Sequence, residues 1–135
     1  MTARNDVTGD AIQTKTVTDS YRNNFDKIFK KEQKVTWNIV ELDVIRWSEA
    51  RGIIPNSTSK AQLTKAYEEM NELSEAISNR DRDGIVDGLG DVLVCLINVA
   101  ALEDLDLTQC LKAAYEQIKD RKGYMNADGI FVKET

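Results

Sequence analysis

The chain of 135 residues is long enough for one domain with a moderate core. Its net charge of −5 argues against general binding to a nucleic acid polymer, which needs a basic face. It contains no histidine, which excludes imidazole bases, Ser-His-Asp nucleophile systems and His-ligated zinc. Any catalysis must therefore use carboxylates, lysines, tyrosines, cysteines or a metal held by oxygen atoms.

The pattern of apolar residues predicts an all-α fold, a helical bundle of about four to five helices completed by oligomerisation. Residues 1–17 are polar, and we expect them to be disordered or loosely attached, with a single domain over residues 18–135. The role of the first 35 residues is left open. Helices are expected over about residues 21–29, 37–51, 59–78, 83–103 and 111–118, followed by a short extended C-terminal tail at 130–132.

Several predicted helix ends carry recognisable sequence signals. Residues 53–56 contain the only proline of the chain and are expected to form a break. Ser59 and Gln62 have the spacing of a capping box at the start of the third predicted helix. Either Asp106 or Thr108 is expected to cap the last helix.

The predicted helix over 83–103 has apolar residues around most of its circumference, so we expect burial on nearly all sides. Asp87, Asp91 and Asn98 fall within about 40° of one another on this helix and form a narrow polar stripe. A buried carboxylate must be paired or must coordinate a metal ion. The apolar run at 92–102 is too short to span a bilayer, and no membrane partner is expected.

Cys95 and Cys110 form no CxxC motif and lie at apolar positions of predicted helices. We interpret them as two buried free thiols in a reducing compartment. The first 18 residues are polar and show no signal peptide. The expected location is therefore the cytoplasm.

Two pairs of acidic residues are the candidate metal ligands. Glu69 and Glu72 lie about one turn apart on the third predicted helix, and Asp87 and Asp91 about one turn apart on the fourth. If these helices pack together, four carboxylates converge and repel one another unless a cation lies between them. Ligands that are all oxygen indicate a hard ion, Mg²⁺ with Mn²⁺ as a substitute. The glutamates alone would be explained as a solvated helix face.

A basic cluster near the C-terminus is a candidate phosphate-binding site. Lys119, Arg121 and Lys122 follow the last predicted helix, where cations also stabilise the helix dipole. The alternative is contact with a phosphate chain. Lys65 lies one turn before Glu69 and could contact phosphate in the same way or pair with that glutamate.

Two further side chains are candidate substrate contacts. Trp47 lies at helical spacing, which is typical of a core residue, but its ring could also stack on a base. Asn98 belongs to the polar stripe and could contact substrate.

Four segments together resemble the MazG-like all-α nucleoside triphosphate pyrophosphohydrolases. They are QLTKAYEEMNELSEAI at 62–77, GDVLV at 90–94, IKDRKGYM at 118–125 and DGIFVKE at 128–134, the last two typical of the small phage and bacterial branch. The family pattern is E-x-x-E, a spacer, then E-x-x-D. Glu69, Glu72 and Asp91 match it, whereas Gly88 stands where the second half has Glu. Asp87 is our substitute for that acid.

The resemblance implies hydrolysis of an NTP or dNTP to the monophosphate and pyrophosphate, with Mg²⁺ required. A metal-activated water would attack the α-phosphorus, and Glu69 or Glu72 would orient or deprotonate it. The family's dimers or tetramers, with sites between helices of paired subunits, imply a homo-oligomer, located in the host cytoplasm if a phage encodes it. The base and sugar preference, the number of metal ions and the choice of general base are left open.

Three alternatives are compatible with the same residues. One is a narrower dUTPase-like or dCTPase-like specificity within the same superfamily. Another is a non-catalytic helical interaction module that keeps the fold, which the missing Glu at position 88 favours. The third is a structural bundle with a surface rich in acids.

Overall fold

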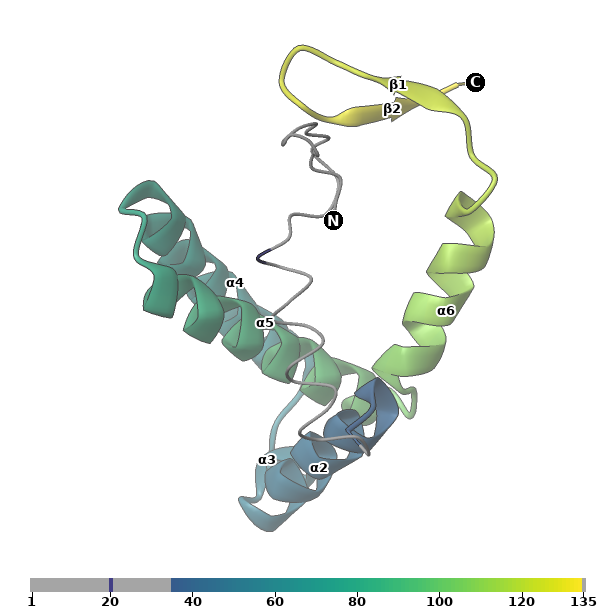
Figure 1. Cartoon of the computed structure of the whole chain (residues 1–135). Coiled ribbons are helices and arrows are strands. Elements are labelled where there is room, and N and C mark those ends of the chain that lie inside the picture. Colours follow the sequence, from purple (N-terminus) through teal and green to yellow (C-terminus); the bar gives the residue numbers. More distant parts are fainter. Residues whose placement is uncertain (1–19, 21–34, 135) are drawn as a thin grey trace. The chain divides into compact units, whose positions relative to one another are not determined.

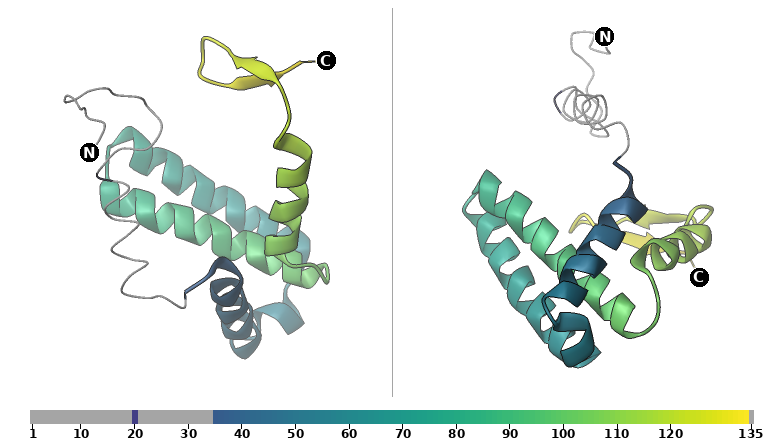
Figure 2. Two further views of the ribbon diagram at one scale, coloured as in Figure 1. Left: turned by 45° about the vertical axis from the view of Figure 1, so that its right-hand side comes forward. Right: turned by 90° about the horizontal axis from the view of Figure 1, so that it is seen from below.

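The structure, a computed structural model, describes Ser20 and residues 35–134 (Figures 1 and 2). The helix expected over 21–29 and the boundary expected at residues 17 and 18 lie outside the described residues. The chain from Trp37 onward clusters as one unit, and the site is built within it.

The all-α prediction is confirmed for the part of the chain that the structure describes. Helices and strands occur in the order α2 (Trp37–Ala50), α3 (Ile53–Asn56), α4 (Ser59–Ser78), α5 (Arg82–Leu102), α6 (Leu107–Ile118), β1 (Gly123–Met125) and β2 (Phe131–Lys133). The expected break at residues 53–56 is a single helical turn, α3, which follows Gly52 in the left-handed region at φ 82°.

The expected capping box at the start of α4 is wrong by one residue. Thr58 is the N-cap, and its hydroxyl accepts a hydrogen bond from the Ala61 N–H at 3.1 Å. Ser59 is already helical. Gln62 does not return to the cap backbone, since its side-chain amide donates to the Ser57 hydroxyl at 3.1 Å.

The start of α6 is held by two carboxylates. Asp106 is the N-cap, as one of the two expected alternatives, and accepts from the Gln109 N–H at 2.7 Å. Glu41 of α2 is only 3% exposed and accepts from the N–H groups of Leu107 and Thr108 and from the Thr108 hydroxyl. The first N–H groups of a helix lack partners within the helix, so Glu41 satisfies them and joins α2 to α6.

Helices α4 and α5 lie side by side along most of their length (Figures 1 and 2). They are in tight contact at Gly88, where an added Cβ would lie 3.0 Å from Leu73 Cβ and 3.1 Å from Leu73 Cα. The absent side chain therefore permits this packing. An added Cβ at Gly90 would meet nothing within 4 Å, and nothing in the described residues explains that glycine.

The expected burial of α5 on nearly all sides is wrong within one chain. Val86 and Leu89 are 61% and 53% exposed, and Asp87 and Asp91 are exposed too. By length and composition α5 could cross a membrane, with a mean hydropathy of 2.0, but core helices of soluble proteins pass the same test. The small buried apolar residues lie mainly on α4 and α5: Ala66, Ala76, Cys95, Ile97 and Ala100. Both cysteines are free, but Cys110 is exposed rather than buried.

The last part of the chain has few contacts with the helices before it. Helix α6 has no buried residue. The predicted extended tail is confirmed as β2, which pairs antiparallel with β1 in the register Tyr124 to Val132. Among the described elements, these two strands contact each other and no helix.

Candidate functional site

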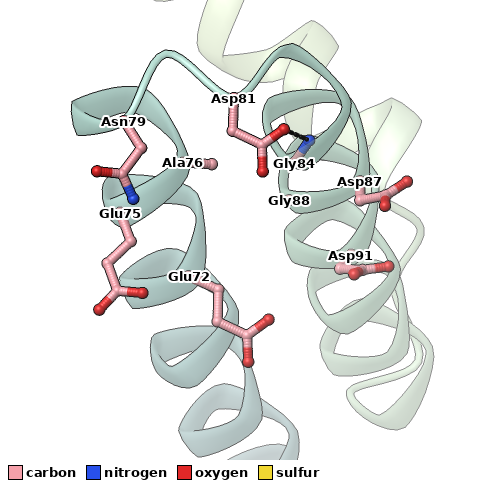
Figure 3. A pocket seen from close by; sticks show the side chains of 9 residues that line it. All are labelled: Glu72, Glu75, Ala76, Asn79, Asp81, Gly84, Asp87, Gly88 and Asp91. Atoms are coloured by element: carbon pink, nitrogen blue, oxygen red, sulfur yellow. Dashed lines mark hydrogen bonds between the residues drawn. The ribbon is translucent and has the colours of Figure 1, made fainter.

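A pocket between α4 and α5 collects most of the predicted acidic ligands (Figure 3). It has a volume of about 530 Å³, and we call it the acid pocket. Its lining contains no lysine or arginine, so the negative charges gathered there have no basic partner within it. The lining residues are Glu72, Glu75, Ala76, Asn79, Asp81, Gly84, Asp87, Gly88 and Asp91.

Three of the four predicted metal ligands line this pocket, namely Glu72, Asp87 and Asp91. Asp87 and Asp91 lie about one turn apart on α5 and point to the same side (Figure 3). The glycine at position 88 faces Leu73 at the helix contact, so the Cβ of a glutamate there would clash with Leu73 unless that residue shifted. Asp87, one residue earlier, brings a carboxylate to the pocket without that clash.

Two acids of the pocket were not among the predicted site residues. Glu75 lies one turn after Glu72, a spacing that could have identified it. Asp81 precedes α5 and accepts a hydrogen bond from the Gly84 N–H at 3.0 Å (Figure 3). Asp81 is therefore occupied as a helix cap, whereas Glu75 adds a further carboxylate at the rim.

The donor set of the acid pocket fits a hard cation. In the described residues no three acidic or cysteine side chains lie close enough together to hold a metal ion by themselves. Mg²⁺ normally keeps several waters and uses one or two carboxylates together with substrate phosphates, so it needs no closed protein cage. A lining of carboxylate and amide oxygens suits such an ion and does not suit structural zinc.

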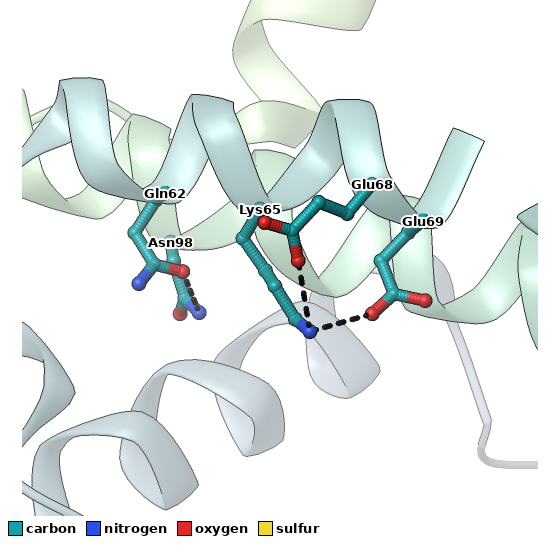
Figure 4. A network of polar contacts seen from close by, with 5 residues as sticks. All are labelled: Gln62, Lys65, Glu68, Glu69 and Asn98. Carbon is teal, nitrogen blue, oxygen red and sulfur yellow. Dashed lines mark hydrogen bonds and ion pairs between the residues drawn. The ribbon is translucent and has the colours of Figure 1, made fainter. Parts of the chain in front are cut away.

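The fourth predicted ligand, Glu69, does not line the acid pocket. It is 8% exposed, and its carboxylate lies 3.2 Å from the Lys65 ammonium (Figure 4). Glu68 lies 3.6 Å from the same ammonium. The hydrogen bond and the charge of Glu69 raise the pKa of Lys65, so the lysine stays protonated and neutralises Glu69.

Two of the predicted acids influence the buried thiol of Cys95. Burial raises the pKa of Cys95, and the negative charge of Glu69 raises it further, with a smaller effect from Asp91. Cys95 follows Asp91 by one turn on α5. Glu69 remains paired with Lys65.

Asn98 lies in a buried polar network between three helices. It is 2% exposed and accepts from the Ser48 hydroxyl at 2.6 Å. It donates to Gln62 at 3.1 Å (Figure 4). The hydrogen bonds join α2, α4 and α5. Both polar ends of the Asn98 amide already have protein partners. A substrate contact by Asn98 stays a prediction.

Trp47 lines a second cavity, of about 360 Å³, between α2 and α5. We call it the apolar pocket. Asp91 lines both pockets, so the two adjoin at this carboxylate. The Arg51 guanidinium lies 5.5 Å from the centroid of the Trp47 ring. The complete lining is Val40, Asp43, Val44, Trp47, Asp91 and Val94, of which Asp43 was not predicted from the sequence.

The basic cluster lines neither pocket. Lys119 lies 2.7 Å from Glu116 on α6, and Arg121 and Lys122 lie between α6 and β1. Their contact with a phosphate chain stays a prediction.

Comparisons with known proteins identify relatives of this arrangement. The family model described as the MazG nucleotide pyrophosphohydrolase domain matches residues 57–125, more than half of the chain. An uncharacterised 18.2 kDa protein from the rep-hol intergenic region of Haemophilus phage HP1 is 30% identical over 64 residues. That match spans 47% of this chain and 39% of the phage protein.

A solved structure has the same fold. It is the cyanophage S-2L MazG-like pyrophosphohydrolase bound to dGDP and three catalytic Mn²⁺ ions per active site. The TM-score is 0.58 at 21% sequence identity, and the match covers 75% of this chain and 99% of the cyanophage chain.

Proposed function

Because the chain belongs to the MazG nucleotide pyrophosphohydrolase domain family, we propose that it hydrolyses nucleoside or deoxynucleoside triphosphates to the monophosphate and pyrophosphate. The observation that carries this proposal is the acid pocket, which gathers Glu72, Asp87 and Asp91 from two adjacent helices without a basic partner. We place the activity in the cytoplasm, the host cytoplasm if a phage encodes the protein.

A divalent cation is part of the proposal, with Mg²⁺ as the physiological ion and Mn²⁺ as its substitute. One or two of the carboxylates of Glu72, Asp87 and Asp91 would hold it together with water and substrate phosphates, and the cyanophage relative with its Mn²⁺ ions supports this chemistry. The ion supplies Lewis acidity toward phosphate oxygens and lowers the pKa of a bound water. Attack of water at the α-phosphorus breaks the bond to the bridging oxygen and releases pyrophosphate.

The two predicted catalytic glutamates have different surroundings. Glu72 is exposed, lines the acid pocket and has no ion pair within the described residues. It can therefore orient a water molecule or accept its proton. Glu69 is paired with Lys65 at 3.2 Å, so a cation bound by Glu69 would compete with that lysine. A released Lys65 ammonium could then contact phosphate.

Pyrophosphate release from a panel of NTPs and dNTPs, with Mg²⁺, with Mn²⁺ and with EDTA, tests the proposal directly. We expect release with either metal ion and none with EDTA. Turnover restricted to dUTP or dCTP would favour the narrower specificity. The non-catalytic interaction module, favoured by the glycine at position 88, would be correct if no nucleotide released pyrophosphate.

Substitution of the pocket acids tests which residues carry the activity. Glu72→Ala and Asp91→Ala should abolish turnover while helicity by circular dichroism stays largely unchanged, because both side chains are exposed. Asp87→Ala should cause a severe but incomplete loss. Asp83→Asn is the matched control, an exposed acid on α5 outside both pockets. Full activity of both alanine variants would show that the assigned site is wrong.

We also propose a homo-oligomer, either a dimer or a tetramer. Large apolar side chains are at least 41% exposed on α4, α5 and α6, more than a stable monomer normally leaves in contact with water. A partner subunit would also bring its basic cluster to the acid pocket, whose lining contains no lysine or arginine. The exposed side chains are Leu63, Tyr67, Met70, Ile77, Val86, Leu89, Leu111, Tyr115 and Ile118.

A further inference from the structure

The apolar pocket has the composition of a small-ligand site. Three valines and Trp47 make up most of its lining, and its charged lining residues are Asp43 and Asp91. Concave sites with apolar walls and a few polar groups typically bind flat organic ligands, and about 360 Å³ lies within their usual range. A base can stack on an aromatic side chain such as Trp47.

The position of Asp91 links this pocket to the proposed reaction. A nucleotide whose phosphates lie in the acid pocket would reach the apolar pocket with its base, since Asp91 lines both. The inference that follows rests on the proposed function in this respect. It leaves Asp43 as the carboxylate available to the base.

Asp43 is an exposed carboxylate among the residues that line the apolar pocket. It lies on α2 beside the valines and Trp47, and it forms no hydrogen bond or ion pair within the described residues. An ionised carboxylate accepts hydrogen bonds at both oxygens and donates none. A ligand edge with two neighbouring donors would therefore pair with it best.

We propose that the apolar pocket binds the nucleobase and that Asp43 selects guanine. Guanine has two adjacent donors, N1–H and the 2-amino group, which match the two oxygens of one carboxylate. Adenine and cytosine place a ring acceptor beside their amino group, and uracil and thymine place carbonyl oxygens on both sides of their N–H. Each of these bases would bring an acceptor toward the carboxylate, which weakens binding.

Exchanging the hydrogen-bonding groups of Asp43 tests the proposal. In Asp43→Asn one oxygen is replaced by a donor, and the amide then matches xanthine, which has N1–H beside a 2-carbonyl oxygen. We expect kcat/KM of the wild type to favour GTP over XTP by about 10- to 100-fold, and Asp43→Asn to reverse the order. Asp43→Ala should lose the preference for either base. Glu49→Gln, an exposed acid on the same helix outside this pocket, should keep the wild-type preference.

A binding measurement separates this inference from the hydrolytic function. The dissociation constants of GMP and xanthosine monophosphate are measured in EDTA by tryptophan fluorescence, with circular dichroism to verify folding. Reversal of the GMP preference in Asp43→Asn supports the inference even if no triphosphate is hydrolysed, in which case the proposed function alone is wrong. Hydrolysis with the same base preference in wild type and Asp43→Asn overturns the inference and leaves the function intact. Absence of GMP binding together with absence of base preference in hydrolysis also overturns it.

Discussion

At the scale of single residues, Glu41 is the buried acid with the clearest structural role. Burial by itself would raise the pKa of the Glu41 carboxyl, but hydrogen bonds from the Thr108 hydroxyl and from the N–H groups of Leu107 and Thr108 lower it overall. The folded state therefore favours the ionised form. This carboxylate fixes the start of α6, a helix without buried side chains of its own.

We predict that Glu41→Gln lowers the free energy of unfolding by about 1–3 kcal/mol at neutral pH, because two acceptor oxygens become one. A carboxyl with a lowered pKa stabilises the fold fully above its unfolded value, 4.5, and loses that contribution as pH falls through the lower folded value. The difference between wild type and variant should thus shrink in acid. Urea unfolding from pH 7 down to the lowest pH at which the protein stays folded measures the free energy of unfolding of both proteins. A difference between them that stays constant with pH would contradict this account.

At the scale of elements, the contact between α4 and α5 depends on a residue without a side chain. Gly88→Ala should destabilise the protein by about 1–3 kcal/mol, since the new methyl group meets both Cα and Cβ of Leu73 at about 3 Å. Gly90→Ala is the matched control two positions later, and it should stabilise the helix by about 1 kcal/mol because its methyl group meets nothing. Urea unfolding measures the change in the free energy of unfolding for both variants, which should be opposite in sign. Equal changes would show that the contact at Gly88 is not tight.

The same contact explains how much of the candidate site was predictable. The spacing of the acids along each helix predicted that Glu69, Glu72, Asp87 and Asp91 would converge if the two helices packed together, and three of the four line the acid pocket. The sequence does not specify which face of α4 meets α5, and that choice separates Glu69 from the pocket and includes Glu75. Asp43 could not be predicted for the same reason, since α2 meets Asp91 only through tertiary packing.

At the scale of the whole molecule, we predict that active sites combine the acids of one subunit with the basic cluster of another. Asp91→Asn and the double variant Arg121→Ala/Lys122→Ala should each be inactive or nearly so. When the two variants are mixed in equal amounts and their subunits exchange, half of the dimers contain one subunit of each variant. Each mixed dimer has one intact site of its two, so about a quarter of wild-type activity should return. Pyrophosphate release, with light scattering to measure the oligomer, is the readout.

A mixture of Asp91→Asn with Glu72→Gln is the control for this experiment. Both changes lie in the acid pocket, so no site in a mixed oligomer is intact and no recovery is expected. Recovery in neither mixture, with exchange of subunits verified, would place the basic cluster outside the shared site.

The sequence by itself determined the four long helices of the described residues, because apolar periodicity and capping residues act over a few neighbouring positions. It also determined the family, through the acids and glycines of 62–94 and the tail after α6. Tertiary structure alone decided which acids share a pocket, that Lys65 neutralises Glu69, and that Asn98 is buried between three helices. These depend on the rotation of packed helices about their axes, which is set by contacts such as Gly88 against Leu73 that no local pattern encodes.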